Sequence, residues 1–339
     1  MDCKYTLSAL LIILVFLLPK ATTTTIVPTL DVSQLASEAT LIAIGQVMSI
    51  EETGRGEYEM GGRLIPARQM VASFRVDRVV KGEAGAEISI SFLSPDELTG
   101  YAELAPDQFG MFFLRATSKG LSTVSPYHPF IVALREDCAS KGPEIARVVA
   151  ELGCVVHSST ATIRQRAEGI RALESVRTDD SNSVLRHAAD ELFSPLNVLA
   201  ASALISHNDI SVLPLFEEAA QRSSILEVKD HNYSLSLNLG VALEEVRDQA
   251  AIPSLARLME ASEAGTRRGA AQALRNIGTE AAIEPLAKGL YDADWEVRWL
   301  SVMGLAGIEQ KTSWYPAYDN FKQNEQLYLD HWRAWVRQR

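Results

Sequence analysis

The feature that most constrains this chain is a stretch of sequence that recurs at a fixed interval of 31 residues. GTRRGAAQALRNIG at 265–278 is followed by EVRWLSVMGLAGIE at 296–309, and Leu274 matches Leu305 across the two copies. The apolar segments that precede them, AAIPSLARLM and AAIEPLAKGL, recur at the same interval. A fixed period of this size is typical of a solenoid, in which each unit buries its apolar faces only against its neighbours.

Each unit of the repeat predicts two short helices, because its apolar residues recur with the helical period of about 3.6 residues. A weaker copy begins with LAASALI at 199–205 and lies 39 residues before its next match, which predicts an insertion of about eight residues (39 − 31) near 222–232. We therefore predict an all-α solenoid of about three to four helix pairs over 161–312, preceded by a linker helix within 137–160. The polar residues 177–183 are expected to interrupt the helices.

An acidic residue precedes an arginine by four positions in both copies, as Glu263 and Arg267 in one and as Asp294 and Arg298 in the next. This spacing places both side chains at the start of the second helix of a unit. The acid can cap free N–H groups there, and we expect the arginine to reach the acid of the neighbouring unit. Because every repeated feature has a packing reason, the motif predicts a structural ladder and not a catalytic site.

The helical units resemble the HEAT-like repeats of phycobilisome bilin lyases and of many other proteins. The resemblance rests on DWEVR at 294–298 and on the segment AAIEPLAKGL, and it covers about 195–310. It implies stacked helix pairs. It implies a lyase activity only by analogy, because one fold can host many functions.

Residues 30–136 show the period of two that is typical of strands. In AEISISFLS at 86–94, for example, apolar residues occupy alternate positions. Turn signals such as KG, SPD and SKG separate the apolar runs, and several short strands with such punctuation predict a small all-β barrel. The glycine-rich segment 53–67 is either a long loop or an additional hairpin that turns at Gly61 and Gly62.

The order of these strand signals resembles the OB-like barrel of the netrin and tissue-inhibitor-of-metalloproteinase (NTR-like) superfamily. The segments that carry the resemblance are IGQV at 44–47, FRVDRVVKG at 74–82 and FGMFFL at 109–114. Protease inhibition is implied only by analogy. The chain lacks the N-terminal cysteine of the eukaryotic inhibitors, so their metal-chelating mechanism is not carried over.

The N-terminus predicts a signal peptide over residues 1–23. Its apolar core from Leu7 to Leu18 spans 12 residues, whereas a membrane-spanning helix needs about 20. A short apolar core that follows a lysine and precedes small residues is typical of secretory signals. We therefore expect an exported protein, periplasmic, in the cell envelope or secreted, with no stable membrane span after signal removal. The style of the repeats and domains indicates a bacterial source.

The net charge of the chain argues against a nucleic-acid partner. The formal charge is −11, and phosphate binding depends on Lys and Arg. Charge of this sign favours solubility and disfavours anionic surfaces.

Two cysteines remain once residues 1–23 are removed, namely Cys138 and Cys154. Export would allow them to pair. We predict a disulfide between them that joins the end of the barrel to the start of the helical region.

The sequence carries no recognisable catalytic or metal-binding motif. Its six histidines form no HExxH or HxxxH pair, and neither GxSxG nor GxxxxGK[ST] occurs. We therefore predict no catalytic residue, no cofactor and no metal site.

The C-terminal segment 313–339 is rich in aromatic residues. Phe321, Tyr328, Trp332 and Trp335 are spaced by 7, 4 and 3 residues, which places them on one stripe of a helix. The stripe predicts a helix that caps the last repeat, as a solenoid requires. The alternative is an aromatic recognition patch.

Together these features predict an exported, non-catalytic scaffold that binds a protein partner, not yet identified, through its helical-repeat surface. The rival functions are an enzyme of the lyase type and a protease inhibitor. A lyase should carry an ionisable cluster in the groove of the solenoid, and an inhibitor should carry an exposed ridge at the N-terminal edge of the barrel.

Overall fold

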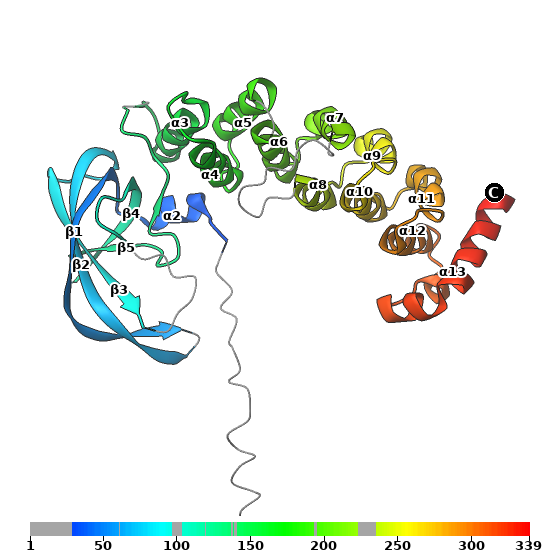
Figure 1. The fold of residues 1–339 in the computed structure, drawn as a ribbon, viewed down its shortest axis with the longest axis horizontal. Coiled ribbons are helices and arrows are strands. Elements are labelled where there is room, and N and C mark those ends of the chain that lie inside the picture. The colour runs from blue at the N-terminus through cyan, green and yellow to red at the C-terminus, as the bar shows by residue number, and fades with distance from the viewer. Residues whose placement is uncertain are drawn as a thin grey trace, which may run out of the picture.

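The computed structural model shows an N-terminal barrel followed by an arch of helices that ends in a long crossing helix (Figure 1). The predicted order, a β-rich domain followed by an all-α repeat region, is confirmed. The structure describes residues 29–60, 62–96, 104–118, 120–136, 138, 141–192, 195–222 and 235–339. The predicted signal segment 1–23 and nearly all of the predicted insertion lie outside these residues.

The N-terminal domain is a barrel in which five strands form a closed circuit. The neighbours run β1–β2–β3–β5–β4 and return to β1, and β3 pairs with β5 in parallel while the other pairs are antiparallel. The short strand β6 adds to β4. The bounds are β1 (Leu41–Met60), β2 (Arg63–Lys81), β3 (Glu87–Pro95), β4 (Phe109–Thr117), β5 (Gly120–Thr123) and β6 (Phe130–Ile131).

The glycine-rich segment left open by the sequence is a hairpin and not a loop. β1 and β2 stay paired past the barrel, from Gly54 opposite Gln69 to Met60 opposite Arg63. Gly62 lies at the tip with a φ of 80°, a left-handed conformation that glycine adopts without steric cost.

Strands β1 and β4 are apolar on both faces because one face fills the barrel and the other packs against the helical region. Ala43 and Phe112 belong to the barrel interior, where the Phe112 ring meets that of Phe74 edge-on at 4.6 Å between centroids. The sequence neighbours Ile42 and Phe113 belong to the core that continues into the helices. The alternation of a strand thus serves two cores at once.

The barrel is fastened to the first helix of the arch, α3 (Glu144–His157), by ion pairs. Arg78 on β2 donates to Glu151 on α3 through Nε at 2.8 Å and also to the carbonyl oxygen of Leu134 at 2.9 Å. Lys81 pairs with Glu144 at 2.9 Å. Because Glu151 is almost fully buried, its charge requires the arginine as a partner.

A disulfide joins Cys138, just after the barrel, to Cys154 on α3, with the Cα atoms 6.2 Å apart. It closes a loop with a sequence separation of 16 residues, and a loop of that size contributes about 3 kcal/mol in the chain-entropy treatment.

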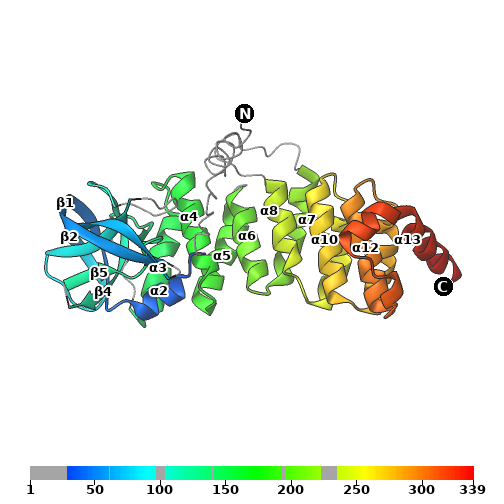
Figure 2. The ribbon, with the colours of Figure 1, turned by 90° about the horizontal axis from the view of Figure 1, so that it is seen from below.

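Within the described residues, ten helices form five pairs along the arch, more than the three to four pairs that the sequence predicted. Figure 1 shows the second helix of each pair on the inner side of the arch, and Figure 2 shows the helices standing side by side. After α3 the bounds are α4 (Ile163–Glu174), α5 (Asp179–Glu191), α6 (Leu196–Ser206), α7 (Leu213–Arg222), α8 (Leu235–Glu244), α9 (Ile252–Leu258), α10 (Ala264–Ile277), α11 (Ile283–Gly289) and α12 (Trp295–Ile308).

Two expectations for the start of the arch need correction. The helix expected as a linker in 137–160 is α3, which packs against both α4 and α5 and so belongs to the stack. The break expected at 177–183 is wrong, because residues 179–183 form the first turns of α5. Thr178 caps that helix by accepting from the N–H of Ser181 at 3.2 Å, and polar residues in such a box begin a helix.

The remaining helices lie at the two ends of the arch. The short helix α2 (Val32–Glu38) contacts α3 and β4 at the barrel end, and α13 (Tyr318–Gln338) crosses the other end (Figure 1). None of the helices in the described part of the chain is both long and apolar enough to span a membrane.

Candidate functional site

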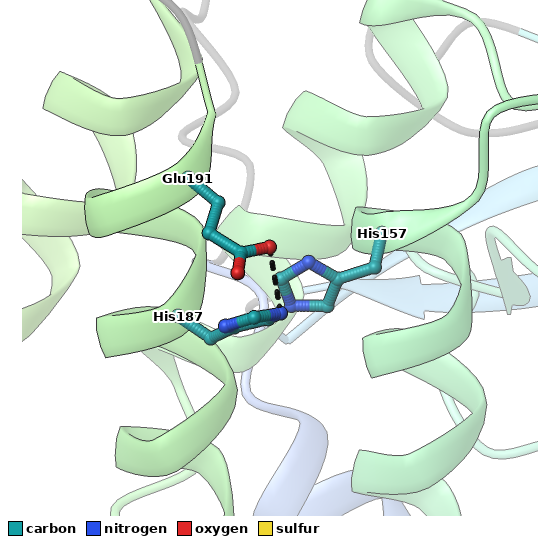
Figure 3. A group of neighbouring side chains, drawn as sticks. All are labelled: His157, His187 and Glu191. Carbon is teal, nitrogen blue, oxygen red and sulfur yellow. Dashed lines mark ion pairs between the residues drawn. The ribbon is translucent and has the colours of Figure 1, made fainter.

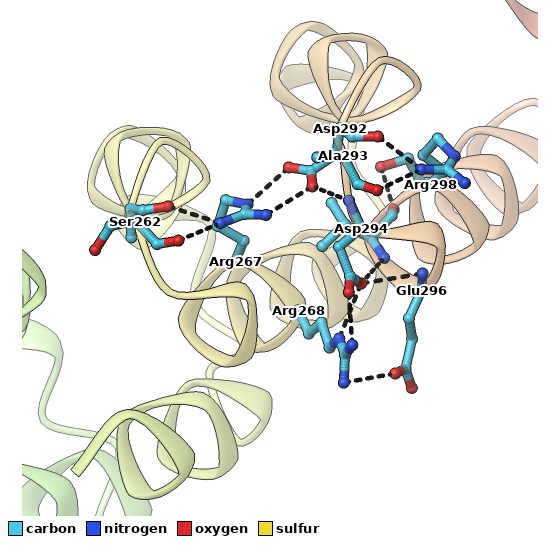
Figure 4. A network of polar contacts seen from close by, with 11 residues as sticks. Ser262, Arg267, Arg268, Asp292, Ala293, Asp294, Glu296 and Arg298 are labelled. Atoms are coloured by element: carbon cyan, nitrogen blue, oxygen red, sulfur yellow. Dashed lines mark hydrogen bonds and ion pairs between the residues drawn. The ribbon is translucent and has the colours of Figure 1, made fainter. Parts of the chain in front are cut away.

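The repeated arginines form a ladder that ties successive units together (Figure 4). Arg267, in the first turn of α10, donates through Nε and Nη2 to the two carboxylate oxygens of Asp292 at 2.8 and 2.9 Å. Its Nη1 donates to the carbonyl oxygens of Ala261 and Ser262 at 2.9 and 2.8 Å. One guanidinium therefore holds the loop of its own unit and the acid of the next, using the fork of donors that only arginine offers.

Arg298 repeats this arrangement one unit later. Its Nη1 donates to the carbonyl oxygens of Asp292 and Ala293 at 2.8 and 2.9 Å, and its Nε donates to Glu325 of α13 at 2.5 Å. The final helix thus supplies the acid that a following unit would have supplied.

The two acidic residues of the motif do not share the capping role that the sequence predicted for both. Asp294 caps α12 by accepting from two backbone N–H groups in its first turn, whereas Glu263 makes no such bond, so its predicted capping role is wrong. The partner of Arg267 is Asp292, because Asp294 is engaged by Arg268 at 2.6 Å. That hydrogen bond from Arg268 holds the pKa of the Asp294 carboxyl below its usual value.

The position of Arg268 becomes aromatic in the next unit, where Trp299 lies 31 residues further on. The ring of Tyr318 meets Trp299 edge-on at 5.5 Å and Trp295 at 5.0 Å between centroids. Arg275 on α10 donates to the hydroxyl of Tyr315 at 2.8 Å. Both tyrosines are exposed and both tryptophans are partly exposed.

These side chains lie on or beside α10 and α12, which are inner helices of the arch (Figure 1). We call them the aromatic surface, which consists of Trp295, Trp299, Tyr315, Tyr318, Arg268 and Arg275. Sequence analysis missed it because its members come from three helices and a loop and share no single helical period. The available signal was the gathering of all five tryptophans at or beyond position 295.

The stripe predicted as a cap lies on α13. Phe321 and Trp332 are fully buried and Tyr328 nearly so, while Trp335 is partly exposed and packs edge-on against Trp332 at 5.3 Å. Three of the four rings are therefore enclosed. This burial favours the interpretation of the stripe as a cap of the last repeat. The exposed aromatic residues lie in the neighbouring aromatic surface.

Ligand-forming side chains that the sequence did not pair meet at the other end of the arch. His157 closes α3, and His187 and Glu191 lie four residues apart on α5; the possible ligand atoms of the three lie within 4.8 Å of one another. The spacing search missed this group because 30 residues separate the two histidines.

Comparison with known proteins identifies the class of the helical region. A family model described as HEAT repeats matches residues 225–306, so the region is a HEAT-like solenoid. No match is found among curated proteins. Among solved structures, human deoxyhypusine hydroxylase is similar at 15% identity and a TM-score of 0.24, over 56% of this chain and 75% of that one. A likeness that low carries no argument about activity.

Proposed function

We propose that this protein is a non-catalytic scaffold whose aromatic surface binds a protein partner. HEAT repeats fit protein partners, because stacked helix pairs create extended concave binding faces. The partner is a folded protein or a peptide segment that inserts apolar side chains beside the exposed rings of Tyr315 and Tyr318.

The observation that carries this proposal is the composition of the aromatic surface. Trp, Tyr and Arg are the residues most enriched among interface positions that dominate binding energy. Here the rings lie beside Arg268 and Arg275, and Arg268 also pairs with Glu296 at 3.0 Å. An apolar centre with a charged rim is the usual anatomy of a protein interface.

The proposal includes export of the protein and an NTR-like identity for the barrel. The disulfide between Cys138 and Cys154 supports an oxidising compartment. The closed circuit of five strands, with one parallel pair, supports the NTR-like assignment. The net charge of −11 supports a partner other than nucleic acid.

Partner binding can be tested by quantitative affinity purification from the native host after chemical crosslinking. The test variant is Tyr315→Ala/Tyr318→Ala, which removes two exposed rings from the aromatic surface. The control is Tyr291→Ala, which removes an exposed ring that packs against Arg333 outside this surface. We expect the double variant to lose at least about 90% of the recovered partner, since loss of two hot-spot rings costs about 2 kcal/mol or more.

The control variant should recover the partner at the wild-type level. Partner recovery unchanged in the double variant would contradict the proposal and would direct attention to the barrel. A catalytic activity of the purified protein in the absence of any partner would favour the enzyme alternative.

A further inference from the structure

The cluster of His157, His187 and Glu191 brings two imidazoles and a carboxylate to one point between α3 and α5 (Figure 3). The two imidazole centroids lie 4.4 Å apart. Nε2 of His187 lies 2.9 Å from a carboxylate oxygen of Glu191. The spacing of four residues on α5 places those two side chains on one face of the helix, toward which the His157 ring points.

One atom of this cluster has no partner within the described structure. Nε2 of His157 is buried and makes no hydrogen bond, although buried polar atoms are almost always satisfied. An imidazole nitrogen that is buried and makes no hydrogen bond is available to bind a metal ion.

We propose that His157, His187 and Glu191 bind a divalent transition-metal ion, with Zn²⁺ as the preferred ion. Two imidazole nitrogens and one carboxylate oxygen form a ligand set that zinc uses, with a further position left for water. Imidazole suits zinc and its neighbours, whereas Mg²⁺ and Ca²⁺ require oxygen ligands.

The geometry allows the ligands to close on an ion. Zinc–ligand distances are about 2.0–2.2 Å. The three ligand atoms lie within 4.8 Å of one another, so a small movement of the side chains brings all three to that distance from one ion. His187 and Glu191 are 52% and 59% exposed, which gives both side chains the freedom to move.

The ion would join the first helix pair of the arch to the second. His157 comes from α3, and the other two ligands come from α5. The site lies next to the fastening of the barrel, because the disulfide partner Cys154 is three residues before His157 on the same helix. Metal binding would therefore stiffen the junction between barrel and solenoid, and this inference does not depend on the proposed partner.

The test uses the full chain without a polyhistidine tag, freed of metal with a chelator and then titrated with Co²⁺. We expect d–d absorption that saturates at about one Co²⁺ per chain and is reversed by Zn²⁺. His187→Asn and Glu191→Gln should each weaken Zn²⁺ binding by about 100-fold or more, since even the partners of metal ligands contribute 10- to 100-fold. Both side chains are exposed, so the variants should fold, which circular dichroism can verify.

The matched control is Asp190→Asn, which neutralises an exposed carboxylate next to Glu191 and should bind Zn²⁺ as the wild type does. Zn²⁺ should also raise the Tm of the wild type and of the control, but not that of Glu191→Gln. The proposal is overturned if the wild type takes up no Co²⁺ or Zn²⁺, or if His187→Asn and Glu191→Gln bind as tightly as the wild type.

Discussion

At the scale of single residues, burial decides which ion pairs stabilise this molecule. The side chains of Arg267 and Asp292 are only 14% and 10% exposed, whereas those of Arg257 and Glu217 are 58% and 18% exposed. Removing one member of a buried pair leaves a charge without compensation, whereas exposed pairs contribute little. The ladder is therefore a structural device whose value depends on both partners being present.

We expect Asp292→Ala to lower the free energy of unfolding by about 3 kcal/mol, because Arg267 would keep only its two carbonyl acceptors. Glu217→Ala should cost about 0.5 kcal/mol. Urea unfolding followed by the helical signal in circular dichroism measures both. Equal losses for the two variants would show that burial does not govern the ladder.

At the scale of elements, close helix packing depends on glycine at one crossing. Gly269 on α10 lies so near Gly240 on α8 that an added Cβ would collide with the carbonyl oxygen of Gly240. Gly307 on α12 has room for a methyl group, since the nearest atom, in the Tyr315 ring, would lie 4.0 Å from an added Cβ, an ordinary van der Waals distance. The same substitution should therefore have opposite effects at the two positions.

Gly269→Ala should destabilise the protein by about 1–3 kcal/mol through overpacking. Gly307→Ala should stabilise it by up to about 1 kcal/mol, because alanine loses less backbone entropy in a helix. The difference in thermal midpoint between the two variants is the measurement. A neutral Gly269→Ala variant would mean that α8 and α10 can separate without cost.

The elements also show what the sequence could predict. The period of 31 residues identified the units built on α9 to α12, because identical packing demands identical spacing. The sequence predicted too few helix pairs, because α3 to α6 show the helical period but do not recur at the interval of 31 residues. The cluster of His157, His187 and Glu191 was beyond reach, since only the packing of α3 against α5 brings its members together.

At the scale of the whole molecule, the two ends of the arch are closed by different means. The barrel end is held by the disulfide between Cys138 and Cys154 and by the ion pair of Arg78 with Glu151. The other end has no disulfide among the described residues and is held by packing of α13 and by ion pairs of Arg298 with Glu325 and of Arg339 with Glu280 and Glu309. A solenoid is stabilised by nearest-neighbour contacts, so it unfolds from its weaker end.

Replacing a tryptophan of α13 with alanine tests whether the C-terminal end of the arch unfolds first. Trp332 is fully buried, so Trp332→Ala should cost about 3–5 kcal/mol, whereas Trp335→Ala should cost less because Trp335 is partly exposed. All five tryptophans lie at or beyond position 295, so fluorescence reports the C-terminal units alone. In Trp332→Ala the fluorescence midpoint should fall well below that of the strand signal in circular dichroism. If both signals shift together, the barrel and the arch unfold as one cooperative unit, and unfolding from the C-terminal end is excluded.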